Sequence, residues 1–250
     1  MTEYRLADLT VGIDTEEAGR AISAHIKEQM KAYECADGAG GRPQISVHLT
    51  KGMIEEERRI QGPQFPVDYL ASIAVYRAFC EQALSFDTLF FHSSAVALDG
   101  EAFLFSGPSG SGKSTHAAMW KEAFGDRAVI VNDDKPLIRF LGDRTYVYGT
   151  PWDGKFHRNE NLRVPVRAIC FLGRAQEISI RKIGWQEAKI LASDQSFHAG
   201  SPDHRHRMWM LTNMMLNRVP VYRMDCDISV RAAETAHRFM VTEAENNVHL

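Results

Sequence analysis

The chain has 250 residues, of which 44% are hydrophobic, and a formal net charge of −3 at pH 7. This length fits one large domain or a core with a smaller appendage, and the apolar fraction is sufficient for a sizeable core. The small net charge of mixed sign provides no general affinity for nucleic acids or membrane surfaces.

Neither a signal peptide nor a membrane span is predicted from the hydropathy pattern. The first residues lack an apolar run, and no stretch approaches 18 consecutive apolar residues. The cysteines lie far apart, without a C-x-x-C pair or the spacing of metal ligands, so we expect reduced thiols, three of them in apolar stretches and packed there as small apolar side chains. They are Cys35, Cys80, Cys170 and Cys226. These features together predict a soluble cytoplasmic protein.

The first 65 residues are predicted to form a small N-terminal α/β lobe. Its expected elements are a strand over 4–13, a helix over 15–33 with Asp14 as its N-cap, a loop over 36–43 and a strand over 44–49. The charged run 55–59 is interpreted as a solvated surface.

The second domain is predicted to span 66–250. Pro66 starts an apolar helix that reaches about residue 84, and an apolar strand is expected over 89–98. Asp99-Gly100 is typical of a two-residue hairpin turn, so the strand returning over 101–106 is expected to be antiparallel to its neighbour. We therefore predict an α/β fold with a mixed, partly antiparallel sheet.

The remaining elements follow from the same periodicities. Strands are expected over 128–131, 136–140, 145–148, 166–172, 177–183 and 219–224, and helices over 115–124, 185–196, 204–218 and 230–241. Basic residues at 204–207 disfavour a helix N-terminus, which suggests a loop there, either solvated or in contact with an anionic partner. The methionine-rich segment 208–216 favours a packed helix over a sulfur-rich binding surface.

The segment 107–114, with the sequence GPSGSGKS, matches the phosphate-binding pattern G-x-x-x-x-G-K-[ST]. It lies between a predicted strand and a predicted helix, which a glycine-rich linker would not. Its glycines allow backbone N–H groups to converge on an oxyanion at a helix N-terminus. Lys113 would then reach the β- and γ-phosphates, and the hydroxyl of Ser114 would reach Mg²⁺. The candidate phosphate-binding residues are Gly107, Ser109, Gly110, Ser111, Gly112, Lys113 and Ser114.

Two further groups of residues supply what a phosphoryl-transfer site needs. Asp133 and Asp134 follow a short strand, and carboxylates there can bind a hard cation and accept a proton from an alcohol. Because neighbouring side chains on a strand point to opposite faces, we expect the two aspartates to have different tasks. His92 lies on the strand that the hairpin places beside the phosphate-loop strand, so it joins the candidate site.

The segment 148–159 combines turn formers with charged side chains. Lys155 or Arg158 could neutralise charge on a transferring phosphoryl group. The alternative, an exposed turn, is equally consistent with the sequence.

These motifs, in this order, resemble the P-loop superfamily that joins HPr kinase/phosphorylase to ATP-dependent phosphoenolpyruvate carboxykinase. The resemblance rests on HSSA at 92–95, the hairpin, FSGPSGSGKST at 105–115 and NDD at 132–134. The segment GTPWDGK at 149–155 is most similar to compact HPr-kinase-related proteins and stands where HPr kinases carry a signature stretch. Carboxykinases are about twice as long, and the basic segments that hold their dicarboxylate have no counterpart here.

The resemblance implies roles for individual residues. Asp134 matches a metal-binding aspartate, Asp133 matches the residue near the acceptor, and His92 matches a histidine beside the metal and the transferring phosphate. Thr115 extends the nucleotide site. The implied catalytic residues are Asp133, His92, Lys113 and Lys155, and the implied metal ligands are Ser114 and Asp134.

The resulting hypothesis is a kinase that uses ATP and Mg²⁺ to phosphorylate a hydroxyl of a protein, a peptide or a small metabolite. The alternatives are a carboxykinase-like lyase, a non-catalytic nucleotide-binding module and a binding domain without nucleotide. No nucleic acid or membrane partner is expected, and resemblance to hexameric kinases leaves homo-oligomerisation open.

Overall fold

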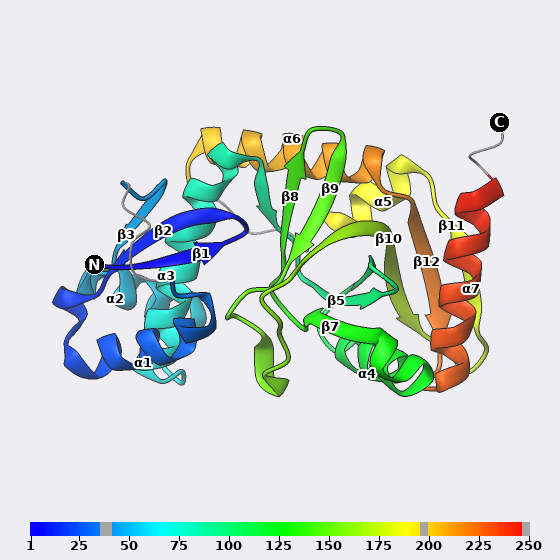
Figure 1. The fold of residues 1–250 in the computed structure, drawn as a ribbon, viewed down its shortest axis with the longest axis horizontal. Coiled ribbons are helices and arrows are strands. Elements are labelled where there is room, and N and C mark those ends of the chain that lie inside the picture. The colour runs from blue at the N-terminus through cyan, green and yellow to red at the C-terminus, as the bar shows by residue number, and fades with distance from the viewer. Residues whose placement is uncertain (36–41, 196–199, 247–250) are drawn as a thin grey trace. The chain divides into compact units, whose positions relative to one another are not determined.

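The computed structural model describes residues 1–35, 42–195 and 200–246. The chain divides into two compact units, Met1–Phe86 and Asp87–Leu250 (Figure 1). This boundary differs from the one expected after residue 65, because helix α3 (Val67–Ala83) packs against α1, α2 and β3 of the first unit. Within the described residues, no helix has the length and apolar character needed to cross a membrane.

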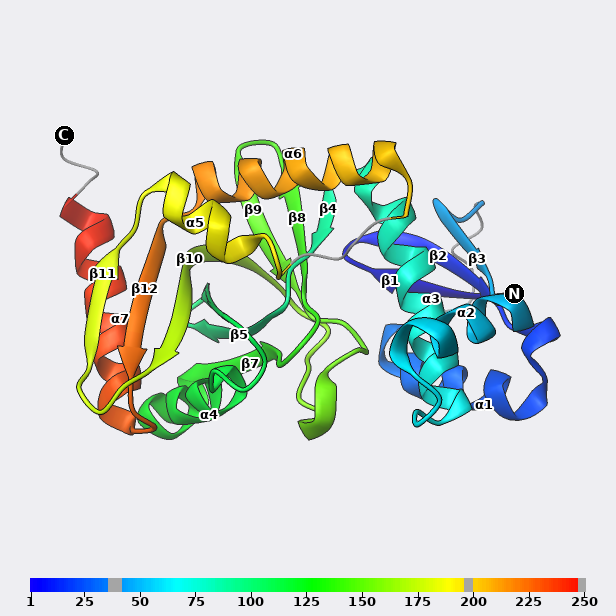
Figure 2. The same cartoon turned by 180° about the vertical axis from the view of Figure 1, so that it is seen from behind.

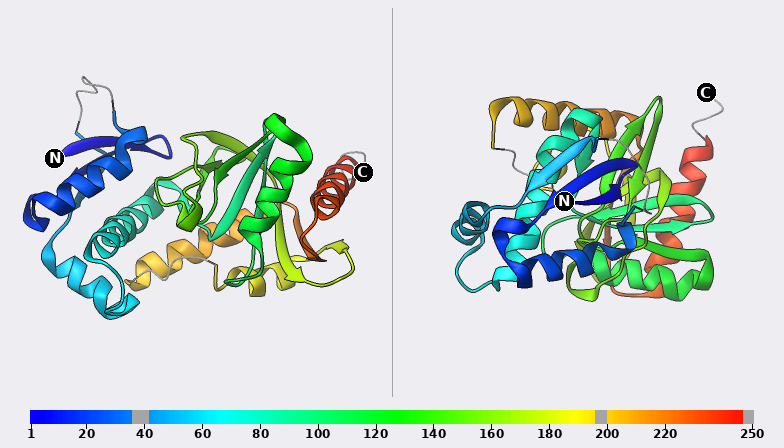
Figure 3. Two further views of the ribbon diagram at one scale, coloured as in Figure 1. Left: turned by 90° about the horizontal axis from the view of Figure 1, so that it is seen from below. Right: turned by 60° about the vertical axis from the view of Figure 1, so that its left-hand side comes forward.

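The first unit is a three-stranded sheet with helices. In chain order its elements are β1 (Thr2–Leu6), β2 (Leu9–Asp14), η1 (Glu16–Ala18), α1 (Arg20–Met30), η2 (Lys31–Tyr33), β3 (Ile45–His48), α2 (Lys51–Gln61), α3 and η3 (Leu84–Phe86). β2 is central, antiparallel to β1 and parallel to β3. Figure 3 shows α1 beside α3.

Two sequence predictions for this unit were wrong in detail. The strand predicted over 4–13 is a hairpin, because Ala7 and Asp8 both have positive φ, 51° and 60°, and turn the chain back. Alanine is uncommon in such a turn, so nothing in the sequence indicated it. The helix predicted over 15–33 is interrupted at Gly19, whose φ is 92°. Most of the loop predicted over 36–43 lies outside the described residues.

The charged run 55–59, interpreted as solvated, lies in α2 and is only partly exposed. Glu57 is 1% exposed and is paired with Arg77 of α3, whose Nη2 donates to Oε2 at 3.1 Å. Helical spacing places Glu57 on the same inner face as Ile54. Tertiary packing therefore buries one charge of this run, and the pairing compensates for its desolvation.

Arg77→Met is expected to lower the free energy of unfolding by about 3 kcal/mol, because it leaves the Glu57 carboxylate buried without its cation. Arg59→Met, which removes an exposed pair with Glu56 on the same helix, should change it by less than about 1 kcal/mol. Urea unfolding of the full chain measures both. Equal effects of the two substitutions would contradict the conclusion that Arg77 compensates the buried carboxylate of Glu57.

The second unit contains a nine-stranded mixed sheet. Its strands are β4 (Thr88–Phe90), β5 (Ser93–Leu98), β6 (Glu101–Ser106), β7 (Ala128–Asn132), β8 (Leu137–Leu141), β9 (Arg144–Tyr148), β10 (Arg163–Arg174), β11 (Ser179–Lys182) and β12 (Val221–Cys226). The order is β4-β8-β9-β10-β6-β5-β7, with β12 also paired to β10 and β11 to β12. β10 begins antiparallel to β9 and ends parallel to β6 and β12. The predicted mixed sheet is confirmed.

Helices cover this sheet in two groups (Figures 1 and 2). They are α4 (Lys113–Phe124), α5 (Trp185–Ala192), α6 (Pro202–Arg218) and α7 (Val230–Asn246), with single turns at η4 (Gly125–Arg127) and η5 (Gly154–Phe156). α4 and α7 pack on each other and on the sheet around the fully buried Trp120, whereas α6 packs on α5, β4 and β9. Burial lowers the pKa of His116 to about 4, so its neutral Nε2 accepts a hydrogen bond from Trp120 Nε1 at 3.1 Å.

The predicted Asp99-Gly100 hairpin is confirmed, with φ of 52° and 84° and with β5 antiparallel to β6. The strand predicted over 89–98 is instead two strands, β4 and β5, which pair with different partners on either side of Phe91 and His92. The predicted loop at 204–207 was also wrong. These residues lie in α6, because the Ser201 hydroxyl caps the helix by accepting from the His204 N–H at 3.1 Å.

The four cysteines are free, and three of them, all but Cys35, are buried as expected. Burial raises the pKa of the Cys226 thiol to about 11, which makes it unreactive at neutral pH. The methionine-rich part of α6 is a packed helix in part: Met215 is fully buried, whereas Trp209 and Met210 are 51% and 40% exposed. The helix predicted over 185–196 ends at Ala192, and residue 196 lies outside the described residues.

Candidate functional site

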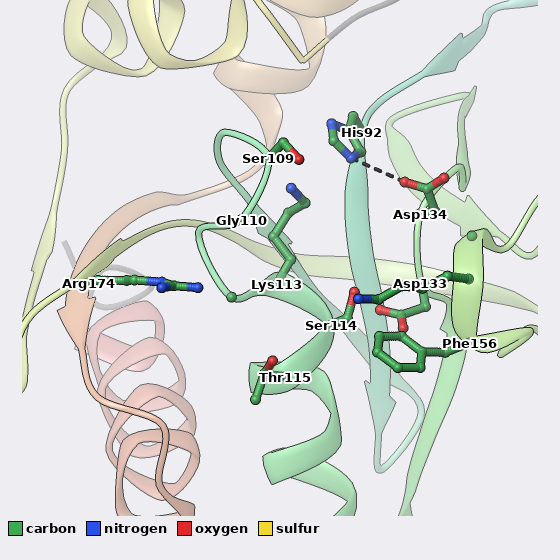
Figure 4. Close-up of a pocket in the computed structure, with 13 residues that line it drawn as sticks. His92, Ser109, Gly110, Lys113, Ser114, Thr115, Asp133, Asp134, Phe156 and Arg174 are labelled. Atoms are coloured by element: carbon green, nitrogen blue, oxygen red, sulfur yellow. Dashed lines mark ion pairs between the residues drawn. The ribbon is translucent and has the colours of Figure 1, made fainter. Parts of the chain in front are cut away.

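A pocket of about 450 Å³ lies where the glycine-rich loop 107–112 joins β6 to α4. β10 and β12 run parallel to β6, so the carboxyl ends of three strands meet at this edge of the sheet, the usual place for ligand binding in α/β proteins. The pocket is lined by His92, Ser109, Gly110, Gly112, Lys113, Ser114, Thr115, Asp133, Asp134, Gly154, Lys155, Phe156 and Arg174 (Figure 4).

The glycine-rich loop depends on backbone conformations that favour glycine. Gly107, Gly110 and Gly112 have φ of 140°, 79° and 101°. A Cβ at Gly107 would also lie 3.0 Å from the carbonyl oxygen of Leu172 on β10. Gly112 stands at the N-cap of α4, so the first N–H groups of that helix, which have no partner within the helix, border the pocket. Such N–H groups are suited to bind an anion.

The ammonium group of Lys113 lies against this loop. Its Nζ donates to the carbonyl oxygens of Gly107 at 2.9 Å and Pro108 at 3.2 Å, and the side chain is 8% exposed. Burial lowers the pKa of Lys113, while the nearby carboxylates of Asp133 and Asp134 act in the opposite direction. A cation is therefore held at the start of α4, on the loop side of the pocket.

Asn132 shapes the backbone that carries the two aspartates. It is fully buried at the end of β7, and its Oδ1 accepts from the N–H groups of Asp134 at 2.9 Å and Lys135 at 2.7 Å. Its Nδ2 donates to the carbonyl oxygen of Thr150 at 3.0 Å. This turn relaxes the strict alternation of a strand, so both aspartates line the same pocket.

Asp133 is 4% exposed, and only one of its carboxylate oxygens has a hydrogen-bond partner. Ser94 Oγ on β5 donates to Oδ1 at 2.6 Å, whereas Oδ2 is buried without a partner. Burial raises the pKa of Asp133, although the hydroxyls of Ser94 and Ser114 and the charge of Arg158 oppose the rise. Asp133 therefore keeps one buried carboxylate oxygen without a hydrogen-bond partner.

Asp134 has a different environment. His92 Nε2 lies 3.2 Å from its Oδ1, and Lys135 Nζ pairs with Oδ2. Although burial disfavours ionisation, the hydrogen bond from His92 and the charge and hydrogen bond of Lys135 lower the pKa of Asp134 to about 2. Asp134 is therefore a carboxylate throughout the physiological range, as metal binding requires. The two aspartates therefore have different partners, Ser94 for Asp133 and His92 with Lys135 for Asp134.

The segment 153–159 forms the wall of the pocket beside Asp133. Asp153 is 7% exposed and accepts from Asn159 Nδ2 at 2.6 Å. η5 follows it and carries Lys155 and Phe156 on the pocket, with the Lys155 ammonium 4.7 Å from the phenyl centroid. The segment is anchored at its buried end by Asp153, whereas Lys155, Phe156 and His157 are exposed.

The donor set fits a magnesium nucleotide. Two buried oxygen atoms at the site, Asp133 Oδ2 and Ser111 Oγ, lack a hydrogen-bond partner, and an incoming ligand could supply one. In the described parts of the chain, no cluster of three or more His, Cys, Asp or Glu side chains could hold a metal ion by itself. Mg²⁺ bound to one or two protein oxygens commonly completes its shell with phosphate oxygens and water.

Comparison with known proteins assigns a family. The family model described as "SynChlorMet cassette protein ScmC" matches residues 69–241, more than half of the chain. The chain belongs to the ScmC family. That description names a cassette and no reaction. No curated protein matches the sequence.

Among solved structures, the HPr(Ser) kinase/phosphatase from Coxiella burnetii is similar to this ScmC-family chain. The identity is 10%, the TM-score is 0.33, and the match covers 64% of this chain and 99% of that chain. A similarity this low says nothing about what the ScmC-family chain binds.

The structure of this ScmC-family chain brings most of the sequence-predicted site residues into one pocket. Those that line it are His92, Ser109, Gly110, Gly112, Lys113, Ser114, Thr115, Asp133, Asp134 and Lys155. Gly107 and Ser111 lie in the loop but do not line the pocket. Arg158 does not line the pocket either, and its guanidinium lies 5.0 Å from the centroid of the Phe156 ring.

Sequence reasoning did not single out three of the lining residues, Gly154, Phe156 and Arg174. Phe156 lies within a segment that was considered only for its charges. Arg174 is at the end of β10, and its sequence signal is a cation that directly follows an apolar strand. That signal becomes informative only when β10 is known to lie parallel to β6.

Proposed function

We propose that this chain binds Mg²⁺-ATP in the pocket and transfers the γ-phosphoryl group to a hydroxyl acceptor. The observation that carries the proposal is the meeting of Lys113, at the N-terminus of α4, with Asp133 and Asp134 in one pocket. The loop and α4 supply N–H groups and a cation for phosphate oxygens, and the aspartates supply carboxylates for a metal ion and for an acceptor proton.

Each residue has a role that follows from its surroundings. Ser114 and Asp134 would hold Mg²⁺, which would neutralise charge on the phosphate oxygens. His92 positions Asp134 through its contact at 3.2 Å. Lys155, on the wall near Asp133, stabilises negative charge on the transferring group.

The carboxylate of Asp133, which lines the pocket, is the base. It accepts the proton of the acceptor hydroxyl as that oxygen bonds to the γ-phosphorus. The bond from the γ-phosphorus to the bridging oxygen breaks in the same step, and ADP leaves with the electron pair. The products are a phosphate ester, ADP and one proton on the enzyme. The acceptor is a serine of a protein or peptide, or the hydroxyl of a small metabolite.

Titration calorimetry with Mg²⁺-ATP, beside transfer from γ-labelled ATP into peptides and metabolites of a host extract, tests the proposal. Binding followed by label in an acid-stable ester is the expected result. Binding without transfer or hydrolysis would make the chain a non-catalytic nucleotide-binding module. Turnover of oxaloacetate with ATP would make it a carboxykinase-like lyase, and the absence of any nucleotide binding would overturn the proposal entirely.

A further inference from the structure

The pocket has two chemically different ends (Figure 4). On one side of the glycine-rich loop lie Asp133, Asp134 and His92, which come from the ends of β7 and β5. On the other side lies Arg174, at the end of β10. The strand order β10-β6-β5-β7 explains this arrangement, since β6, which carries the loop, lies between β10 on one side and β5 and β7 on the other.

No described residue holds the side chain of Arg174 in a contact at the protein surface. Among the described residues it forms no side-chain hydrogen bond or ion pair, and it is exposed. Asp225 lies on the neighbouring strand β12, and its Oδ1 is 3.7 Å from Nη2 of Arg223. By contrast, Lys113 donates to two loop carbonyls, and Lys155 lies over a phenyl ring. Arg174 therefore offers the pocket an uncompensated guanidinium.

The direction of a nucleotide in this pocket follows from the proposed function, on which this inference rests. The γ-phosphate must lie beside Asp133 and Asp134, where the acceptor loses its proton. The loop holds the phosphates in the middle. The ADP part of the nucleotide must then extend past β6 toward β10, where Arg174 is the cation that lines the pocket.

We propose that Arg174 holds the ADP half of the nucleotide and makes no contact with the transferred phosphoryl group. A guanidinium suits this part of the ligand because its planar fork pairs with phosphate oxygens and stacks on aromatic bases. Arg174 is thus a nucleotide-binding residue, which acts on ground state and transition state alike, and not a catalytic residue.

Binding of ATP and of ADP to the full chain, each with Mg²⁺, tests this assignment. Arg174→Ala should weaken both by the same factor, about tenfold, the cost of losing one hydrogen bond to a charged group. The maximal rate of ATP hydrolysis at saturation should stay unchanged, because uniform binding affects KM and leaves kcat alone. Arg181→Ala, which removes an exposed arginine of β11 paired with Glu187, is the matched control and should change neither affinity.

The changes in the affinities for ATP and for ADP, each relative to the unmodified protein, decide the outcome. Equal losses for ATP and ADP support the assignment. A loss confined to ATP would place Arg174 on the transferred phosphate, and unchanged affinities would remove it from the site; either result overturns the inference while leaving the proposed function intact. Failure of the unmodified protein to bind either nucleotide would overturn both.

Discussion

Lys113→Met is expected to weaken Mg²⁺-ATP binding by about 100-fold. The substitution keeps a side chain of similar length at the start of α4 but removes the ammonium that donates to the loop carbonyls of Gly107 and Pro108. An interaction between a charged donor and phosphate oxygens contributes about 1.5 to 3 kcal/mol, which corresponds to roughly 10- to 150-fold in affinity. Titration calorimetry of the full chain measures it.

Lys121→Met is the matched control for this substitution. Lys121 lies on the same helix, is exposed, and pairs with Asp126 at 3.3 Å on the surface. It should bind Mg²⁺-ATP as the unmodified protein does, and both variants should unfold at similar urea concentrations. Unchanged affinity in Lys113→Met, with the fold intact, would contradict the nucleotide site.

Asp133→Asn is expected to reduce the rate of phosphoryl transfer by about a thousandfold, within the usual range for loss of a general base. The amide keeps an oxygen that can accept the hydrogen bond from Ser94 Oγ, so the fold and the affinity for Mg²⁺-ATP should change little. Single-turnover release of label from γ-labelled ATP, with water as the acceptor, measures the rate before a natural acceptor is identified.

Two other substitutions help to interpret the effect of Asp133→Asn on the transfer rate. Asp143→Asn, in the exposed turn between β8 and β9, is the matched control and should leave the rate unchanged. Asp134→Asn should instead raise the Mg²⁺ concentration needed for half-maximal activity, because it removes a metal ligand. If Asp133→Asn kept the full rate, the base would have to be another group.

Local rules allowed much of the fold to be predicted. The Asp99-Gly100 hairpin, the loop between β6 and α4, and the strands after it depend on dihedral preferences and on periodicity within a few residues. Where local signals were weak, the prediction failed: Ala7 and Asp8 turn the chain without a typical turn sequence, and Gly19 interrupts a helix whose apolar pattern continues.

The sequence predicted those parts of the candidate site that depend on residues close together in the chain. The glycine-rich loop is contiguous, so its pattern is visible in the sequence, and the aspartate pair follows soon after it. Arg174 is separated from Lys113 by many residues, and no local pattern connects them. Only the parallel pairing of β10 with β6 brings Arg174 to the pocket.

The sequence by itself determined the phosphate-binding pattern, the mixed sheet that follows from the hairpin before it, and the residue types available for phosphoryl transfer. Only the tertiary structure decided which oxygen of Asp133 is unused, why Asp134 stays ionised beside His92 and Lys135, and which cation lies across the loop from them. The physical reason is that backbone preferences act between near neighbours in the chain, whereas desolvation and pairing of charges depend on groups that the fold brings together from distant segments.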